Sequence, residues 1–413
     1  MKFNIWNDFP QKPLPELLDF IVDNRGKTVP TVSQEEACEI VLIATNCIRN
    51  ENLYPVYEKV RYISKETYEK WFRAHPISGD IIFVNKGTPG RICFCPENID
   101  FCIAQDMMAF RVNSSVLYNK YLLAVLRSRE MQEQISITSV GDTIPHFKKE
   151  FLKELTIPLP PMDVQQIIGD YYFKLSEKIE LNKKINENLE QQIQAILLNM
   201  IQQDSKKDCI ETVKLGEYLY IKGRIGWKGL KKDEYLDSSD YRIINGESLT
   251  KDGIDWNKAG FISKERYDES PEIMLQVGDI LLSKDGTIGK IGYVDNLDSP
   301  STVASGIFVI RNIKPDIIST QFIYYLLKSK LFSAFIASRT EGSVIPHLYQ
   351  KDFMEFAFPL PNADEMSQFD ALTSPLFATV IKNLRENEFL TATRDALLPK
   401  LMNGEIDVSA VKI

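Results

Sequence analysis

The chain has 413 residues, of which 44% are hydrophobic and 26% are charged, a composition typical of folded globular domains. Its net charge of −8 excludes a uniformly basic coat for nucleic acid, although local basic faces are allowed. No run approaches the ~20 apolar residues that span a bilayer, the N-terminus lacks the apolar core of a signal peptide, and the cysteines show no paired spacing. We therefore expect a cytoplasmic protein of two or three domains that makes no membrane contact.

Self-comparison indicates that the chain is a tandem repeat. The segment SKETYEKW from Ser64 matches SKERYDES from Ser263, and at the same offset of 199 residues SGDIIFVNKGTPGRI from Ser78 matches VGDILLSKDGTIGKI from Val277. Further along, GDTIPH from Gly141 matches a second GSVIPH segment at an offset of 201. Because chance matches would not keep this register, two related units of about 200 residues are predicted.

Each predicted unit changes in texture along its length. Strand-like runs, Gly- and Pro-marked turns and short amphipathic helices come first, at 39–44, 80–84, 119–129, 279–283, 306–310 and 320–329. A Pro-Leu-Pro boundary follows, and then a helical stretch with almost no Gly or Pro. This pattern predicts globular domains at 1–157 and 206–358, a central helix at 158–205 and a C-terminal helix at 359–413.

The two helical stretches carry the apolar spacing of a coiled-coil seam, with alternating steps of four and three residues over 168–200 and again over 369–401. Each seam contains two asparagines at equivalent positions: Asn182, Asn186, Asn383 and Asn387. A buried asparagine fixes register, because an out-of-register pairing leaves its amide unpaired; the alternative is a solvated flank. The expected fold is therefore α+β, a tandem pseudo-twofold repeat of two mixed α/β globular domains, each followed by a long helix, with the two helices paired as an antiparallel coiled coil.

No motif in the sequence predicts catalysis. There is no GxxxxGK[ST] phosphate loop, no GxSxG elbow and no Cys/His cluster with the spacing of metal ligands. His146 and His347 are repeat mates within Ile-Pro-His. We expect them to cap the turn into the following helix, with a DNA-backbone contact as the alternative, and we expect no metal or other cofactor.

The glycine loops that follow the Gly-Asp-Ile strands are the best candidates for binding. Glycines let a polyanion approach backbone N–H groups, and flanking cations and hydroxyls can contact phosphates or base edges; an ordinary solvated hairpin is the alternative. The predicted DNA-binding residues are Lys86, Thr88, Arg91, Lys284, Thr287 and Lys290 in these loops, Arg25, Lys27, Arg224 and Lys228 in an early loop of each unit, Thr45, Asn46 and Asn245 at polar strand ends, and Lys148 and Lys149 after the first Ile-Pro-His.

These two halves, each with a GDI…GxxG loop and an Ile-Pro-His/Pro-Leu-Pro passage into a long helix, resemble the specificity (S) subunits of type I restriction–modification enzymes over nearly the whole chain. The resemblance implies target-recognition domains at 1–157 and 206–358, with spacer helices after each. It also implies a non-catalytic subunit that binds double-stranded DNA, two methyltransferase (modification) subunits and ATP-driven restriction/translocase subunits. One departure is visible: where the family commonly starts the helix with Glu-Gln, this chain has VQQ from Val164 and EMS from Glu365.

Because the halves differ greatly outside the shared frame, we expect them to read different half-sites of an asymmetric, bipartite DNA target, with the coiled coil setting the unread gap. Two alternatives are a coiled-coil scaffold that does not touch DNA and a stand-alone DNA-binding regulator. An enzyme that itself modifies or cuts DNA is disfavoured by the missing motifs.

Overall fold

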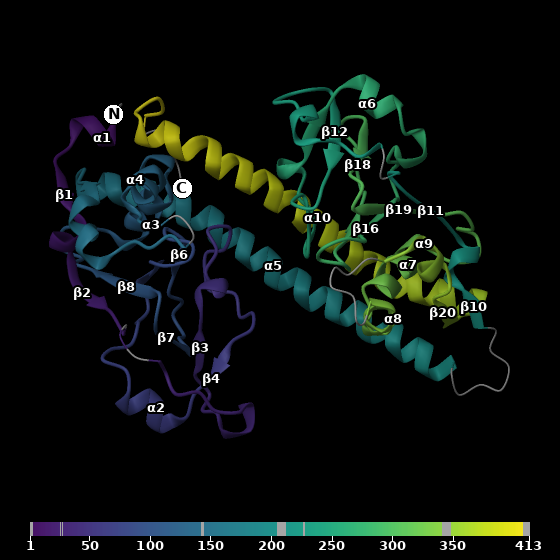
Figure 1. The fold of residues 1–413 in the computed structure, drawn as a ribbon, viewed down its shortest axis with the longest axis horizontal. Coiled ribbons are helices and arrows are strands. Elements are labelled where there is room, and N and C mark those ends of the chain that lie inside the picture. Colours follow the sequence, from purple (N-terminus) through teal and green to yellow (C-terminus); the bar gives the residue numbers. More distant parts are fainter. Residues whose placement is uncertain are drawn as a thin grey trace. The chain divides into compact units, whose positions relative to one another are not determined.

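The computed structural model describes residues 3–24, 26, 28–141, 144–204, 212–225, 228–340 and 348–407. The chain divides into two compact units, of which unit 1 consists of Met1–Leu181 with Phe389–Ile413 and unit 2 of Asn182–Glu388. Each of the two long helices (Figure 1) therefore contributes residues to both units. The helices are α5 (Met162–Asp204) and α10 (Ala363–Met402). The domain limits expected from the sequence stay a prediction, because this division cuts through both helices.

The described residues of unit 1 form three small sheets, whose orders are β2-β8-β5-β6, β4-β3-β7 and β1-β9. All of its strand pairs are antiparallel except β3–β7. The strands are β1 (Gln11–Pro13), β2 (Leu18–Val22), β3 (Val41–Ile43), β4 (Arg61–Tyr62), β5 (Ile81–Val84), β6 (Ile92–Phe94), β7 (Phe101–Ile103), β8 (Met107–Val112) and β9 (Thr156–Pro158). The shorter α-helices are α1 (Ile5–Asp8), α2 (Lys65–Lys70), α3 (Asn119–Arg127) and α4 (Arg129–Thr138).

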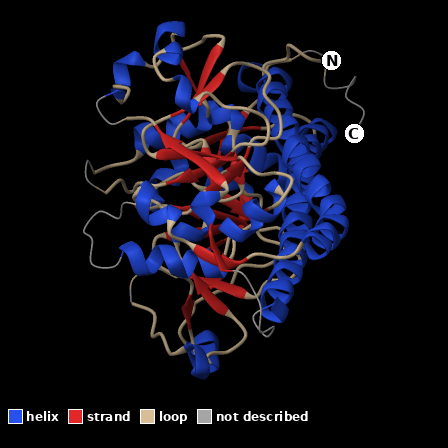
Figure 2. Ribbon diagram, turned by 90° about the vertical axis from the view of Figure 1, so that its right-hand side faces the viewer, coloured by secondary structure: helices blue, strands red, loops and turns tan. Residues whose placement is uncertain are grey.

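Unit 2 repeats every one of these sheets with the same strand order, as β11-β19-β16-β17, β15-β12-β18 and β10-β20, and adds the hairpin β13-β14. The predicted tandem repeat is therefore confirmed. Its strands are β10 (Thr212–Lys214), β11 (Leu219–Gly223), β12 (Tyr241–Ile244), β13 (Leu249–Thr250), β14 (Gly253–Ile254), β15 (Gly260–Ile262), β16 (Ile280–Ser283), β17 (Ile291–Tyr293), β18 (Ser301–Val303), β19 (Ile307–Asn312) and β20 (Ala357–Pro359). Its shorter α-helices are α6 (Lys264–Asp268), α7 (Thr320–Leu327), α8 (Lys330–Thr340) and α9 (Gln350–Met354). Figure 2 shows the short strands in red among helices in blue and loops in tan.

The predicted strands at 39–44, 80–84, 279–283 and 306–310 correspond to β3, β5, β16 and β19. The predicted helix at 119–129 is wrong in one respect, because two helices occupy this region. Ser128 ends α3, and its hydroxyl accepts the N–H of Met131 at 3.3 Å as the N-cap of α4. A serine at this position stabilises a new helix start more than it stabilises continuation of the first helix.

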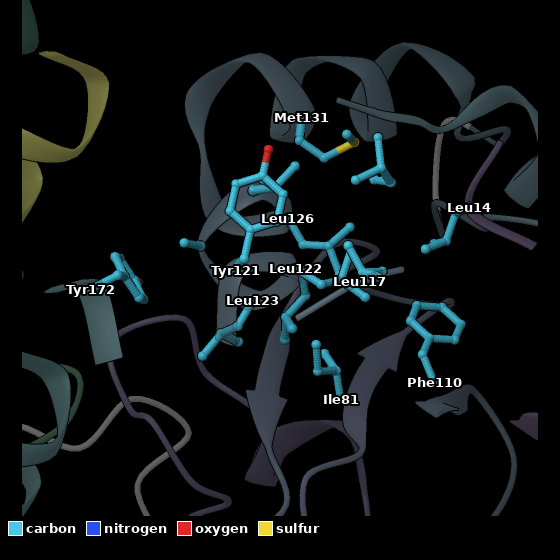
Figure 3. Packing of buried hydrophobic residues seen from close by; sticks show 14 of the residues in the cluster. Leu14, Ile81, Phe110, Leu117, Tyr121, Leu122, Leu123, Leu126, Met131 and Tyr172 are labelled. Carbon is cyan, nitrogen blue, oxygen red and sulfur yellow. The ribbon is translucent and has the colours of Figure 1, made fainter. Parts of the chain in front are cut away.

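The main core of unit 1 surrounds α3, where every residue from Tyr121 to Leu126 is fully buried. Figure 3 shows Leu117 and Leu122 packed between the helices and the strands that carry Ile81 and Phe110. A Cβ on Gly169 of α5 would lie 2.5 Å from the backbone nitrogen of Tyr121. The glycine therefore lets α5 pack directly against the backbone of α3.

A buried ion pair explains the Gly-Asp-Ile signature. Asp80 is 1% exposed and accepts from Arg111 on β8, with Nε at 3.1 Å and Nη2 at 3.0 Å. Asp279 is fully buried and accepts from Arg311 on β19 at 2.6 and 2.8 Å. Two parallel charge-assisted bonds of this kind are strong and directional. The aspartate therefore serves the framework of each sheet by fixing one strand to its neighbour.

The two long helices pair antiparallel, as predicted. In unit 2, Asn182 Nδ2 donates to Asn387 Oδ1 at 2.9 Å, and Asn383 Nδ2 donates to Asn186 Oδ1 at 2.8 Å. The number on α10 falls by four as that on α5 rises by four, which is the relation of antiparallel helices. Asn182, Asn186 and Asn383 are at most 8% exposed, so the alternative of a solvated flank is wrong for these three.

The seam also holds an arginine within unit 1. Arg394 of α10 is 7% exposed, lies 5.2 Å from the ring centroid of Tyr172 and donates from Nη1 to Ser176 Oγ at 3.3 Å. Both contacts are with α5. The same antiparallel pairing is therefore present in each unit.

Candidate nucleic-acid interface

The glycine loop of unit 1 connects β5 to β6. Gly87 and Gly90 have φ values of +83° and +89°, a region that glycine adopts without steric cost. Val84 N donates to Arg91 O at 2.9 Å, and Gly90 N donates to Val84 O at 3.0 Å, which closes the turn. Residues 86–88 are exposed at its tip.

The glycine loop of unit 2, between β16 and β17, repeats this backbone. Gly286 and Gly289 have φ values of +66° and +93°, and Ser283 N donates to Lys290 O at 2.9 Å. Ser283 Oγ also donates to Thr287 O at 2.7 Å and accepts from Lys290 N at 2.9 Å. The two loops therefore correspond residue for residue.

Neighbouring segments hold the loop of unit 1 in place. Asn50 Oδ1 accepts from Ile92 N at 2.8 Å, and Gln132 Nε2 on α4 donates to Gly90 O at 3.0 Å. Neither Asn50 nor Gln132 was among the residues predicted from the sequence. Both use their side chains to bind backbone atoms of the loop, and such contacts leave no motif in the sequence.

The Ile-Pro-His segment of unit 1 lies alongside the same loop. Gly87 N donates to Pro145 O at 2.9 Å, and His146 forms an isolated antiparallel bridge with Lys86. The short helix that follows, Lys149–Glu154, has Lys148 at its N-cap and no side-chain cap. The predicted capping role is therefore wrong for His146, because backbone pairing fixes this segment; His347 lies outside the described residues.

Three predicted residues of unit 1 gather on the glycine loop itself. Lys86 is 47% exposed at its side chain, with Nζ 4.0 Å from Asp106 Oδ1. Thr88 is exposed and Arg91 is half-buried. The loop therefore presents two cations and a hydroxyl together.

The remaining predicted residues of unit 1 are less uniform. Thr45 and Asn46 are half-buried in the short helix Thr45–Cys47. Lys148 and Lys149 are exposed after the Ile-Pro-His segment, and each is within 4.0 Å of a carboxylate. Arg25 and Lys27 lie outside the described residues.

In unit 2 the glycine loop borders an open pocket. Asp285, Thr287 and Lys290 line it together with Gly246, which follows β12. Lys290 Nζ donates to Gly246 O at 2.8 Å, and the Asn245 side chain accepts from two backbone N–H groups of the turn that follows it. The structure therefore brings together the predicted loop and the predicted strand end.

Lys284 is held more tightly than an ordinary surface lysine. Its Nζ lies 5.0 Å from the ring centroid of Phe308, and burial lowers the pKa of its ammonium group, opposed by neighbouring Asp285. Its Nζ also lies 3.3 Å from the position that a Cβ on Gly223 of β11 would take, so the ammonium group lies against the sheet.

Arg224 does not reach the surface, so the prediction that it lies in an exposed contact loop is wrong. It is 1% exposed, donating from Nε to Val303 O at 3.2 Å and from Nη1 to Ser270 Oγ at 3.4 Å. Burial, and then the nearby Arg266, lowers the pKa of its guanidinium. Lys228 is half-buried and donates from Nζ to Glu269 O at 2.9 Å. The side chain of Arg224 thus anchors the segment from inside.

Asp285 is the residue that the sequence reasoning missed. The predicted DNA-binding residues are cations, hydroxyls and amides, whereas the offset of 199 residues aligns the aspartate Asp285 with Lys86. The structure places it, exposed, at the tip of the loop in unit 2.

A metal site, a membrane-spanning helix or a reactive cysteine would each indicate another class of protein. Among the described residues, no group of three His, Cys, Asp or Glu side chains could hold a metal ion. No helix within the described ranges is both long and apolar enough to cross a bilayer. Burial raises the pKa of the Cys93 and Cys95 thiols, which disfavours the reactive thiolate form.

Comparison with known proteins gives a consistent result. The family model described as "Type I restriction modification DNA specificity domain" matches residues 12–191 and again 208–385. The type I restriction enzyme MjaIX specificity subunit of Methanocaldococcus jannaschii is 26% identical over 306 residues, covering 70% of this chain and 69% of that protein. The HindI specificity subunit of Haemophilus influenzae is 24% identical over 400 residues, covering 79% and 86%. The crystal structure of a type I restriction-modification S subunit from M. genitalium shares the fold, with a TM-score of 0.55 at 18% identity over 96% of each chain.

Proposed function

We propose, from the premise that this chain belongs to the family of type I restriction modification DNA specificity proteins, that each of its two units reads one half of a bipartite DNA target. Target recognition is the function of this family's domain, and the chain contains two copies of it.

The observation that carries the proposal is the doubled glycine loop. Both loops have the same backbone conformation and the same closing hydrogen bonds, yet their side chains differ at most positions. A fixed backbone with variable side chains suits base readout, because the frame sets the approach and the side chains choose the bases. Different side chains in the two loops favour different half-sites and thus an asymmetric target.

The long helices are proposed to set the gap between the half-sites. At 1.5 Å per residue, the 43 residues of α5 span about 65 Å. The hydrogen-bonded asparagine pairs support this role, because a slipped register would leave buried amides unpaired. A helix pair of fixed register makes a gap of fixed length.

The chain is proposed to contribute recognition and no catalysis, within a complex that contains two methyltransferase subunits and restriction/translocase subunits in the cytoplasm. The relatives are named as specificity subunits of type I restriction enzymes, which supports a division of labour among subunits. The internal repeat supports two equivalent docking positions, one for each methyltransferase.

A first experiment identifies the target. Adenine methylation is mapped in the genome of cells that carry the gene and of cells that lack it. Loss of methylation at one split motif is expected in the cells that lack the gene, and an unchanged methylation map would contradict the proposal.

A second experiment tests the loop. Full-length chain and its Lys290→Ala variant are titrated with the target duplex at several salt concentrations. We expect weaker binding and a salt slope shallower by about 0.9 if Lys290 contacts one phosphate. Lys314→Ala is the matched control, because Lys314 is exposed and follows the C-terminal end of β19, whereas the glycine loop lies beside the N-terminal end of this strand. Equal affinities and slopes for Lys290→Ala and wild type would remove this loop from the interface.

A further inference from the structure

The tips of the two glycine loops carry opposite charges at the same position. Lys86 precedes Gly87 (φ +83°), and Asp285 precedes Gly286 (φ +66°). Both tip residues are exposed. Because the backbones correspond residue for residue, the two units present an ammonium group and a carboxylate group at one structural position.

The charge on the neighbouring turn also differs between the two units. Asn85, which follows β5, donates its N–H to Asp106 O at 2.9 Å. Lys284, which follows β16, donates its N–H to Gly306 O at the same distance, so Asp106 and Gly306 are counterparts. In unit 1 the acidic group is on that turn, 4.0 Å from Lys86. In unit 2 the counterpart of Asp106 is Gly306, and the acidic group is on the glycine loop instead: Asp285 Oδ2 lies 3.7 Å from the position that a Cβ on Gly306 would take.

Asp285 lies in a pocket that also contains a threonine and a lysine. It lines the open pocket with the Thr287 hydroxyl and with Lys290, whose ammonium group is held by Gly246 O at 2.8 Å. A carboxylate here is repelled by phosphates, so it suits the amino-bearing edge of a base. Conversely, an exposed lysine suits the acceptor edge of guanine.

We propose that the loop-tip residue selects a base in each half-site: Asp285 accepts from the exocyclic amino group of a cytosine, and Lys86 donates to the O6 and N7 atoms of a guanine. This inference rests on the proposed function and adds the chemistry of one position in each half-site. The pairing follows from donor and acceptor patterns in the major groove, where carboxylates pair with the cytosine amino group and lysines with guanine.

The test is selection of duplexes from a randomised library by the full-length chain and by its variants Asp285→Lys and Lys86→Asp. Asp285→Lys is expected to change one position of one half-site from cytosine to guanine, with a change in preference of about tenfold. Lys86→Asp is expected to make the opposite change in the other half-site alone. Asp316→Asn is the matched control, because this exposed aspartate lies beyond the opposite end of β19, and it should leave both half-sites unchanged.

A base analogue gives an independent measurement. Replacing the selected cytosine by 2-pyrimidinone removes only the amino group, and wild-type binding should fall about tenfold. Asp285→Ala should no longer distinguish the two duplexes. The inference is overturned if both tip variants keep the wild-type sequence preference, or if the analogue binds as tightly as cytosine. Such a result, obtained while Lys290→Ala still weakens binding, would leave the proposed function standing; if no loop variant affects DNA, the proposed function itself fails.

Discussion

Replacing Glu388 by glutamine is expected to remove a pH-dependent loss of stability from unit 2. Glu388 lies on α10, and its Oε1 accepts the backbone N–H of Trp256 at 3.3 Å. Burial raises the pKa of this carboxyl to about 7, and Asp255 and Asp295 raise it further by repulsion. The hydrogen bond from Trp256 and the charge of Arg242 oppose this rise only in part.

The direction of the effect follows from the two pKa values. The carboxyl titrates near 4.5 in the unfolded chain and at about 7 in the folded chain. Between these values the folded chain binds a proton that the unfolded chain has released. The free energy of unfolding therefore falls as the pH rises from about 4.5 to about 7, and the full stabilising contribution of the neutral carboxyl is present only below this window.

The magnitude follows from the same difference. At about 1.36 kcal/mol for each pH unit between the two pKa values, the upper bound is about 3 kcal/mol. Glu388 is only half-buried, so solvent screening reduces the expected effect to about 1–2 kcal/mol. Glutamine keeps an oxygen that can accept the Trp256 N–H and removes the titrating group, so the change isolates the charge.

The assay is urea unfolding of full-length wild type and Glu388→Gln at pH 5 and pH 8. Wild type should lose about 1–2 kcal/mol more than the variant between these pH values. Glu187→Gln is the matched control, because Glu187 is the repeat mate of Glu388 and is exposed. If Glu388→Gln shows the same dependence on pH as wild type, the reasoning from burial and repulsion is refuted.

Three further substitutions probe the framework. Asn383→Val should destabilise the chain by about 1–3 kcal/mol, because it leaves the buried amide oxygen of Asn186 without its donor. Adding Asn186→Val should recover most of this loss in thermal unfolding. An equally unstable double variant would contradict the pairing. Asp279→Asn removes the buried partner of Arg311, which is itself 28% exposed, and should cost about 2 kcal/mol in urea unfolding, so a loss below about 0.5 kcal/mol would argue against this ion pair. Gly404→Ala places a residue with a Cβ at a φ of +72°, and that Cβ would lie 2.3 Å from the carbonyl oxygen of Phe3. The free energy of unfolding should fall by at least about 2 kcal/mol, and hydrogen exchange at the end of α10 should become faster. Unchanged exchange would show that this turn adapts.

Features with a regular period could be predicted from the sequence. The helix pair was predictable because a seam with steps of four and three residues must repeat over many turns to bury one face. The repeat itself was predictable because the two units share local patterns at a nearly constant offset. Both features depend on many residues at once, so a single exception such as Arg394 does not hide them.

Features set by the direction of one side chain could not be predicted. Arg224 follows a strand in a segment whose composition is typical of an exposed loop, yet its guanidinium points inward to Val303 O. Asn50 could not be predicted for a similar reason, because its side chain binds the backbone N–H of Ile92, which is distant in the sequence. In contrast, the alignment of the two halves already pairs Lys86 with Asp285, but a search for cations, hydroxyls and amides does not select an aspartate.

The division between buried frame and exposed tip has a consequence for how such a reader can change its target. The residues that fix the sheet, such as Asp80 and Asp279, are at most 1% exposed and are the same in both units. The tip residues Lys86 and Asp285 are exposed and opposite in charge. Surface substitutions usually change stability by no more than about 0.5 kcal/mol, whereas loss of a buried, charged hydrogen-bond partner costs about 1.5–3 kcal/mol. If the tips read bases as proposed, exchange of tip residues alters the base that is read at little cost to folding, and two units of one architecture can then read two different half-sites.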